Sequence, residues 1–195
     1  MIVGLTGGIG CGKSTAGKMF EKLGWGRVDS DELVRQLLSS EPAVIAEIRA
    51  AFGAGVFDDA GVIDRRKLAG IVFPDETALH RLESILHPRV RALWQAAVAQ
   101  PAPAHWVVEI PLLFEKSLEK EFDFTVCLAS DPGVQAERLA SRGFSPQEAS
   151  RRIARQLPLA QKIERADFVV TNNGSLDFLR DQVTWLVDQL TAPAA

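Results

Sequence analysis

The stretch GLTGGIGCGKST, residues 4–15, decides the fold of this chain. It holds five glycines and one lysine, so it offers bare backbone rather than side chains that could build a core. The apolar run that precedes it, Met1–Thr6, predicts a buried strand, and the helical spacing of apolar residues over Ala16–Leu23 predicts a helix after it. The glycine-rich stretch is therefore expected to connect a strand to a helix.

The same stretch fits the pattern G-x-x-x-x-G-K-[ST], which runs here from Gly7 to Ser14. In this pattern successive backbone N–H groups and a helix N-terminus point into one concavity, which suits an anion. Glycine is required because positive φ angles and the close approach of a phosphate oxygen leave no room for a β-carbon. Lys13 is expected to reach the outer phosphates and the Ser14 hydroxyl to ligate Mg²⁺. The pattern predicts a bound nucleoside triphosphate rather than an exposed turn.

Composition limits the class of protein. A chain of 195 residues with 47% hydrophobic content can bury one substantial core, either as one domain or as a domain with an insertion. The net charge of −3 gives no global basic field, so nucleic acid is not a favoured partner. The N-terminus does not resemble a signal peptide, and no run of 18 apolar residues occurs. We expect a cytoplasmic protein without a membrane partner, as a monomer or weak homo-oligomer.

Cysteine and histidine give little support to redox or metal chemistry. Cys11 and Cys127 do not make a disulfide framework in a chain of this size, and we expect both to stay reduced. Cys11 lies near a predicted helix N-terminus, which favours a thiolate, but a small residue filling a tight turn is the preferred interpretation. The three histidines have no metal-ligand spacing with each other or with the cysteines, so zinc has no support.

Five short apolar runs alternate with helical patterns, which predicts a parallel sheet flanked by helices. The runs are Ile2–Thr6, Gly26–Asp29, Trp106–Ile110, Phe124–Ala129 and Phe168–Thr171. The gap between the second and third runs is far longer than a simple crossover. It contains helical patterns over Asp31–Leu38, Ala43–Phe52 and Glu76–Ala99. The gap is therefore interpreted as an inserted helical subdomain, with His87-Pro88 as a structural turn inside it.

Acidic residues stand at the ends of three of the predicted strands, at the sheet edge where ligands of open parallel sheets bind. Asp29 and Asp31 stand where the second strand ends and a helix begins. Asp31 could be a first-turn acid favoured by the helix dipole, or one of the two could accept a substrate hydroxyl proton. Glu109 ends the third strand and either holds a Mg²⁺-bound water or pairs locally. Asp131 precedes a proline and is interpreted as a helix start without a catalytic role.

Arginines gather between residues 135 and 156. Arg138 and Arg142 lie four residues apart, and Arg151 and Arg155 repeat that spacing, so one helix face is predicted to present paired guanidinium groups. Most arginines simply solvate a surface. Phosphoryl transfer, however, needs positive charge over the developing oxygens while water is excluded, and a closing helical lid would supply it. The lid interpretation is preferred for Arg138 and Arg142.

Six segments, in this order, resemble the dephospho-coenzyme A kinase family. They are GLTGGIGCGKST (4–15), VDSDELVR (28–35), LHRLESILHPRV (79–90), EIPLLFE (109–115), the spacing Gln135…Arg138-Leu139…Arg142, and ADFVVTNNG (166–174). The resemblance covers nearly the whole chain, and LHP followed by PLLFE is specific to that family. It implies a three-layer α/β P-loop kinase fold in one domain. The expected parts are a core (about 1–30, 104–135 and 160–191), a helical CoA-substrate insertion (about 31–103) and a lid (about 136–159).

The resemblance also implies the reaction and the residues that perform it. ATP would phosphorylate the ribose 3′-hydroxyl of dephospho-CoA, the final step of coenzyme A synthesis. The catalytic residues would be Lys13, Asp31 as proton acceptor, and Arg142. ATP would contact Gly8, Gly10, Cys11, Gly12, Lys13, Ser14, Thr15, Arg138, Arg142, Asn173 and Gly174, with Ser14 on the metal. The acceptor pocket would be bordered by Asp31, His87, Leu112, Leu113 and Phe114. The family usually has serine or alanine where Cys11 stands, and often aspartate in place of Glu109.

Three rival functions share part of this pattern. A GTPase switch would need a DxxG element, which Asp58–Gly61 matches, and an N/TKxD guanine reader, which TNNG at 171–174 does not match. Another nucleoside or nucleotide kinase would share the loop, insertion and lid, and acceptor profiling would distinguish it. A non-catalytic nucleotide-binding module would leave Asp31 and the arginines without a purpose.

Overall fold

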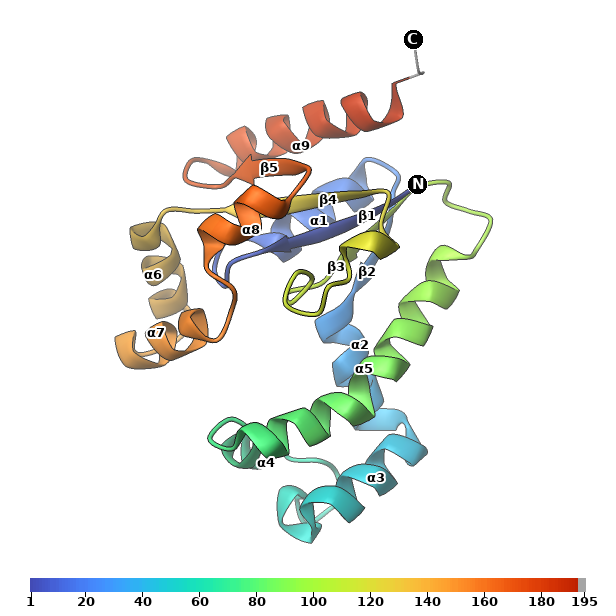
Figure 1. The fold of residues 1–195 in the computed structure, drawn as a ribbon, viewed down its shortest axis with the longest axis vertical. Helices are drawn as coiled ribbons and strands as arrows, with labels where there is room; N and C mark the ends of the chain where they lie inside the picture. The colour runs from blue at the N-terminus through green and yellow to red at the C-terminus, as the bar shows by residue number, and fades with distance from the viewer. Residues whose placement is uncertain (193–195) are drawn as a thin grey trace. The chain divides into compact units, whose positions relative to one another are not determined.

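The computed structural model describes residues 1–192, which divide into two compact units. One unit consists of residues 1–29 together with the chain from Gln100 onward, and it contains the sheet (Figure 1). The other unit, Ser30–Ala99, is built of helices. The sheet unit is therefore made from two separate pieces of the chain, and the helical unit from one.

A five-stranded parallel sheet with the order β2-β3-β1-β4-β5 organises the sheet unit. Its strands are β1 (Ile2–Gly7), β2 (Gly26–Asp29), β3 (Trp106–Glu109), β4 (Phe124–Ala129) and β5 (Phe168–Thr171). The prediction of a parallel sheet flanked by helices is confirmed, and the predicted strand bounds differ by one residue at β1 and at β3. The continuous apolar runs exist because both faces of these strands are covered.

Helices cover the sheet on both faces. They are α1 (Lys13–Lys22), α6 (Pro132–Ser141), α7 (Pro146–Ala154), α8 (Leu159–Arg165) and α9 (Leu176–Thr191), with a 3₁₀ turn η2 (Glu119–Glu121). Val3 and Leu5 of β1 share a buried cluster with Phe20 of α1 and Leu179 of α9, so α1 and α9 pack on one face. The other face packs against α8 and the segment after β3. Leu113 of that segment lies so close to β1 that a β-carbon at Gly4 would be 2.7 Å from Leu113 Cδ1.

The helical unit contains one helix that the sequence pattern did not predict. Its elements are α2 (Ser30–Ser40), α3 (Pro42–Phe52), the 3₁₀ turn η1 (Ala54–Val56), α4 (Arg65–Val72) and α5 (Glu76–Val98). Asp64 is the N-cap of the unpredicted α4, and its carboxylate accepts hydrogen bonds from the backbone N–H groups of Arg66 and Lys67. These two hydrogen bonds lower the pKa of the Asp64 carboxyl. The DxxG match at 58–61 is a turn between η1 and α4, where the Asp58 carboxylate accepts two backbone hydrogen bonds.

Two local predictions are wrong. His87-Pro88 is not a turn, because α5 continues through both residues. Proline lacks an N–H, so α5 forgoes one helical hydrogen bond at Pro88 and packing of the rest of the helix must compensate. The arginines also do not share one helix face: α6 ends at Ser141, Arg142 is its C-cap, and Gly143 (φ +85°) separates it from α7.

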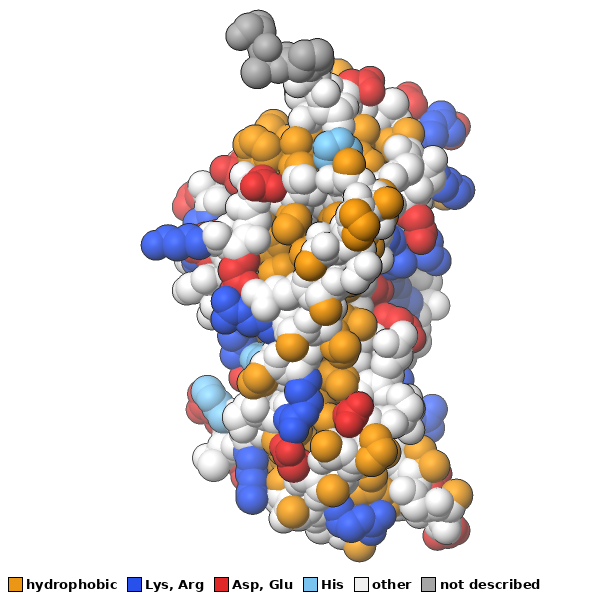
Figure 2. All heavy atoms as spheres, turned by 90° about the vertical axis from the view of Figure 1, so that its right-hand side faces the viewer, with side chains coloured by type: hydrophobic (Ala, Val, Ile, Leu, Met, Phe, Trp, Pro, Cys, Tyr) orange, Lys and Arg blue, Asp and Glu red, His pale blue; other side chains and the backbone are white. Residues whose placement is uncertain are grey.

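Charge is distributed without a large field of one sign on the face drawn in Figure 2, where acidic and basic side chains are interspersed. This agrees with the small net charge of −3. Within residues 1–192, no helix is both long enough and apolar enough to cross a membrane.

Candidate active site

The phosphate loop lies between β1 and α1, and its backbone adopts the conformation that the glycines permit. The φ angles of Gly7, Gly10 and Gly12 are +142°, +82° and +91°. A β-carbon at Gly7 would lie 2.3 Å from the Leu128 carbonyl oxygen, and one at Gly12 would lie 2.3 Å from Asn172 Nδ2. These two positions therefore require glycine for space as well as for φ. The loop ends at α1, which starts at Lys13, three residues before the predicted start.

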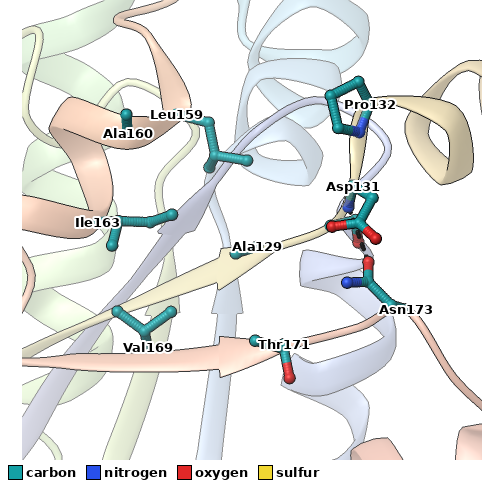
Figure 3. A pocket seen from close by; sticks show the side chains of 10 residues that line it. Ala129, Asp131, Pro132, Leu159, Ala160, Ile163, Val169, Thr171 and Asn173 are labelled. Atoms are coloured by element: carbon teal, nitrogen blue, oxygen red, sulfur yellow. Dashed lines mark hydrogen bonds between the residues drawn. The ribbon is translucent and has the colours of Figure 1, made fainter.

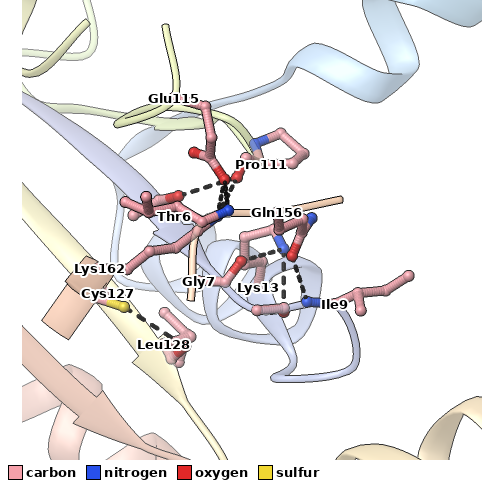
Figure 4. Close-up of polar contacts among 12 residues, drawn as sticks. Thr6, Gly7, Ile9, Lys13, Pro111, Glu115, Cys127, Leu128, Gln156 and Lys162 are labelled. Carbon is pink, nitrogen blue, oxygen red and sulfur yellow. Dashed lines mark hydrogen bonds and ion pairs between the residues drawn. The ribbon is translucent and has the colours of Figure 1, made fainter. Parts of the chain in front are cut away.

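Lys13 folds back over the loop that precedes it (Figure 4). Its Nζ donates to the carbonyl oxygens of Gly7 (3.2 Å) and Gly8 (3.4 Å). The ammonium is thereby held at the loop beside the N-terminus of α1, so its positive charge adds to that of the helix dipole. The chemistry that results is a site for a multiply charged anion.

Helix α6 supports the loop from the side. Gln135, at 6% exposure, donates from Nε2 to Cys11 Sγ at 2.8 Å. Arg138 donates from Nη1 to the Gly10 carbonyl oxygen (3.3 Å) and to Ser130 Oγ (3.1 Å). Cys11 is fully buried, which fits a small residue in a tight turn. Arg142 is exposed at the end of α6, so the structure brings only Arg138 of the predicted pair to the loop.

Asn172 is a buried loop-supporting residue that the sequence reasoning missed. Its Nδ2 donates to the Cys11 carbonyl oxygen at 3.0 Å, and its Oδ1 accepts from Arg138 Nη2 at 3.2 Å. Asn173 and Gly174, the two residues predicted to bind the nucleotide, are both exposed. The Asn173 side chain accepts a hydrogen bond through Oδ1 from the backbone N–H of Asp131 at 2.7 Å. The sequence feature that could have indicated this role is the pair Asn172-Asn173 directly after the apolar run of the fifth strand.

Below α1, three charged residues meet at the carboxyl ends of β2 and β3. Asp29 and Glu109 are register partners, and Arg27 pairs with both, at 3.2 Å to Asp29 Oδ2 and 2.6 Å to Glu109 Oε1. The Ser14 hydroxyl lies close enough to Glu109 to act on its pKa, in the lowering direction. Burial raises the pKa of the Glu109 carboxyl above its ordinary value, although the Arg27 guanidinium acts in the opposite direction. Glu109 thus pairs across the strands, not with residues next to it in the chain.

The position of Glu109 explains a glycine in α1. A β-carbon at Gly17 would lie 2.1 Å from Glu109 Oε1 and 2.9 Å from Arg27 Nε. Helix α1 can therefore approach the carboxylate only because residue 17 has no side chain. The hydroxyl of Ser14 and the carboxylate oxygens of Glu109 and Asp29 are ligand types that Mg²⁺ prefers. Within residues 1–192 no cluster of three His, Cys, Asp or Glu side chains suited to a metal ion is present.

The segment after β3 forms a compact turn, residues 111–118. Leu118 N donates to the Leu113 carbonyl oxygen at 3.0 Å, and Lys116 N to that of Leu112 at 3.1 Å. Leu113 (0% exposed) and Phe114 (2% exposed) are buried in this structure, backbone included, so their place at an acceptor pocket stays a prediction. Leu112 is partly exposed.

Two predicted site residues belong to the helical unit. Asp31 lies in the first turn of α2 and is exposed. A carboxylate in this position is stabilised by the positive end of the helix dipole. His87 is exposed on α5. Their roles stay predictions.

A pocket of about 350 Å³ lies at the ends of β4 and β5 (Figure 3). Leu159 and Ile163 of α8 line one side and Val169 of β5 lines the other, with Asp131 and Asn173 at the polar end. Apolar walls with few polar groups suit a flat organic ring rather than a phosphate.

The glycine-rich loop between the first strand of a parallel sheet and the following helix, with a lysine folded over it, defines a P-loop protein that binds nucleoside triphosphates. The sequence profile of one family in this class, dephospho-CoA kinase, matches residues 1–177. The chain belongs to the dephospho-CoA kinase family and is a kinase, with ATP as the co-substrate that this activity implies.

Individual relatives agree with this assignment. The dephospho-CoA kinase of Geobacillus kaustophilus is 39% identical over 196 residues, covering 98% of both chains. Among solved structures, a Thermus thermophilus protein is 33% identical with a TM-score of 0.85, covering 98% of both chains. The dephospho-CoA kinase of Campylobacter jejuni is 25% identical with a TM-score of 0.71, covering 97% of this chain and 96% of its own. The resemblance predicted from the six segments and the P-loop kinase fold are both confirmed.

Proposed function

We propose that this protein transfers the γ-phosphoryl group of ATP to the ribose 3′-hydroxyl of dephospho-CoA, which completes coenzyme A. The observation that carries the proposal is the phosphate loop with Lys13 folded over it, in a chain that matches the family over residues 1–177. Phosphoryl transfer of this kind requires positioning and charge stabilisation more than covalent chemistry by the protein. The loop N–H groups and the lysine provide the charge stabilisation.

Each site residue has a role in this proposal. The Lys13 ammonium stabilises the negative charge that develops on the transferred phosphoryl group in the transition state. Asp31 orients the acceptor hydroxyl and takes its proton, a role that its place two residues beyond β2 supports. Arg138 fixes the loop through the Gly10 carbonyl and Asn172 and contacts the nucleotide, and Arg142 approaches when the lid closes. Asn173 and Gly174 lie near the adenine, and the pocket at the ends of β4 and β5 offers apolar surface near the same residues.

The oxygen donors beneath α1 fit a divalent cation. We propose that Ser14 would hold Mg²⁺, with Glu109 or Asp29 binding it through water, because the Ser14 hydroxyl lies close to the Glu109 carboxylate. When bound, Mg²⁺ supplies charge neutralisation between the outer phosphates. Arg27 holds both carboxylates in place and offsets their mutual repulsion.

The function is tested by measuring ATP consumption with a panel of acceptors: dephospho-CoA, adenosine and common nucleoside monophosphates. We expect turnover with dephospho-CoA. Lys13→Ala should lower that turnover by at least about a hundredfold, because it removes the cation from the transition state while the loop backbone remains.

Lys18→Ala is the matched control, since Lys18 is an exposed lysine on the same helix. Its turnover should equal that of the parent protein. Preference for a nucleoside monophosphate would favour the rival nucleotide kinase, and near-normal turnover of a folded Lys13→Ala protein would reject the role of the loop.

A further inference from the structure

Lys162 is a charged side chain in an interior position that the reaction, as described, does not use. It is 0% exposed on α8, and its Nζ donates to the Pro111 carbonyl oxygen (2.9 Å) and pairs with Glu115 Oε1 (2.8 Å), as Figure 4 shows. The Pro111 carbonyl also accepts from the Thr6 hydroxyl of β1 at 3.3 Å. Both acceptors of Lys162 therefore belong to the turn of residues 111–118, and the turn is tied to α8 and to β1.

Glu115 connects this turn to a second segment. Its Oε1 also accepts from the backbone N–H of Leu157 at 2.8 Å. The preceding residue, Gln156, accepts from the backbone N–H of Ile9 in the phosphate loop through Oε1 at 3.0 Å. A continuous set of hydrogen bonds thus runs from the phosphate loop, through residues 156 and 157, to the turn.

A buried ion pair is weak evidence of a stabilising role. Desolvation of two charges often outweighs their attraction, and apolar side chains of similar volume can serve stability equally well. The second carboxylate oxygen of Glu115, Oε2, is buried and has no hydrogen-bond partner within residues 1–192, which adds to the cost. What the pair provides that apolar side chains would not is a directed bond to the Pro111 carbonyl.

We propose that the Lys162–Glu115 pair is a positioning device that fixes the turn of residues 111–118 in the geometry that receives the phosphoryl acceptor. This inference rests on the proposed function and on the prediction that this turn borders the acceptor, which the partly exposed Leu112 would contact. Leu113 and Phe114 are buried beside it, so the position of Leu112 is set by the anchoring of the turn. Lys162 and Glu115 act on the acceptor through the turn and do not touch it.

The test replaces both charges at once with side chains of similar volume, Lys162→Met/Glu115→Leu, so that no buried charge remains unpaired. Thermal unfolding, equilibrium affinity for ATP and for dephospho-CoA, and steady-state kinetics are measured. We expect a folded protein in which dephospho-CoA binding is weakened more than ATP binding, and a kcat/KM for dephospho-CoA that is about 10- to 100-fold lower. The matched control is Arg180→Met/Asp177→Leu, an exposed pair on α9, which should leave both affinities unchanged.

If the double variant does not fold, Glu115→Gln carries the test, because it keeps the shape and the bond from Leu157 but removes the charge that holds Lys162. It should weaken dephospho-CoA binding and leave ATP binding unchanged. Parental affinity for dephospho-CoA in a folded variant would reduce the pair to a structural role and overturn the inference. A parent protein that binds ATP but not dephospho-CoA would instead reject the proposed function.

Discussion

Asn172 shows how single residues give the phosphate loop its shape. Its amide donates to the Cys11 carbonyl and lies where any side chain at residue 12 would be, while its carbonyl accepts from Arg138. The Ser130 hydroxyl in turn donates to the Asn172 backbone carbonyl at 2.8 Å. The loop carbonyls of Gly10 and Cys11 are thus held by side chains from α6 and from the end of β5.

Asp31 carries the sharpest prediction at this scale. The acceptor hydroxyl is a poor nucleophile, and general-base catalysis contributes about 10² to 10⁴ in rate. Asp31→Asn should slow single-turnover transfer to dephospho-CoA by about that factor. ATP affinity should be nearly unchanged because the phosphate loop is intact, and the fold should persist because asparagine is tolerated at a helix start.

Asp29→Asn is the control, since Asp29 pairs with Arg27 at the end of β2 and has no assigned part in proton transfer. It should slow transfer less. An Asp31→Asn protein within a few-fold of the parental rate would leave Asp31 as a first-turn acid and direct attention to Asp29 and Glu109.

At the scale of elements, α6 and α7 differ in whether they contact the phosphate loop. Helix α6 lies against the phosphate loop through Gln135 and Arg138, whereas α7 carries exposed arginines and begins with a capping box between Ser145 and Glu148. Arg142 stands between the two helices, next to Gly143. A closing lid would bring Arg142 to the nucleotide only if the movement includes the C-terminal end of α6, where Arg142 is the C-cap.

Arg142→Ala should therefore affect turnover more than stability. An exposed arginine contributes little to the free energy of unfolding, yet one that reaches the transferred phosphoryl group can contribute about 10³ or more in rate. The measurements are kcat and the melting temperature, with the exposed Arg151→Ala on α7 as the control. A lowered melting temperature with unchanged kcat would contradict the lid interpretation.

The elements also show what the sequence could and could not predict. The strands were predicted within one residue because buried parallel strands are continuous apolar runs, and the phosphate loop because its glycines are required by space. The helix through Pro88 could not be predicted, because local proline propensity was outweighed by packing. The structural roles of Asn172 and Lys162 were not predicted, because a polar or charged residue in a short segment is usually exposed. Only the fold shows that both side chains are buried.

At the scale of the whole molecule, Cys127 links stability to pH. Burial raises the pKa of its thiol to about 12 from an ordinary value of 9.0. Between pH 9 and pH 12 the Cys127 thiol is deprotonated in the unfolded chain and still protonated in the folded protein. The contribution of Cys127 to the free energy of unfolding therefore falls as the pH rises through this range. The loss is about 1.4 kcal/mol per pH unit at most.

Cys127→Ala should remove that dependence. The free energy of unfolding in urea is measured for parent and variant at pH 8 and pH 10.5, and the difference between the two proteins should change by about 2 kcal/mol. A constant cavity penalty cancels in this comparison. An equal difference at both pH values would show that the thiol ionises in the folded protein as it does in the unfolded chain.

The insertion of a helical unit between β2 and β3 has a consequence for the newly made chain. β1 bonds only to β3 and β4 in the sheet, so the first strand synthesised has no neighbour until residue 106 and beyond have been translated. The helical unit is contiguous, so it can complete its own core while the N-terminal strand and phosphate loop are still unpaired. The segment that binds ATP is thus made first and must acquire its structure among the last.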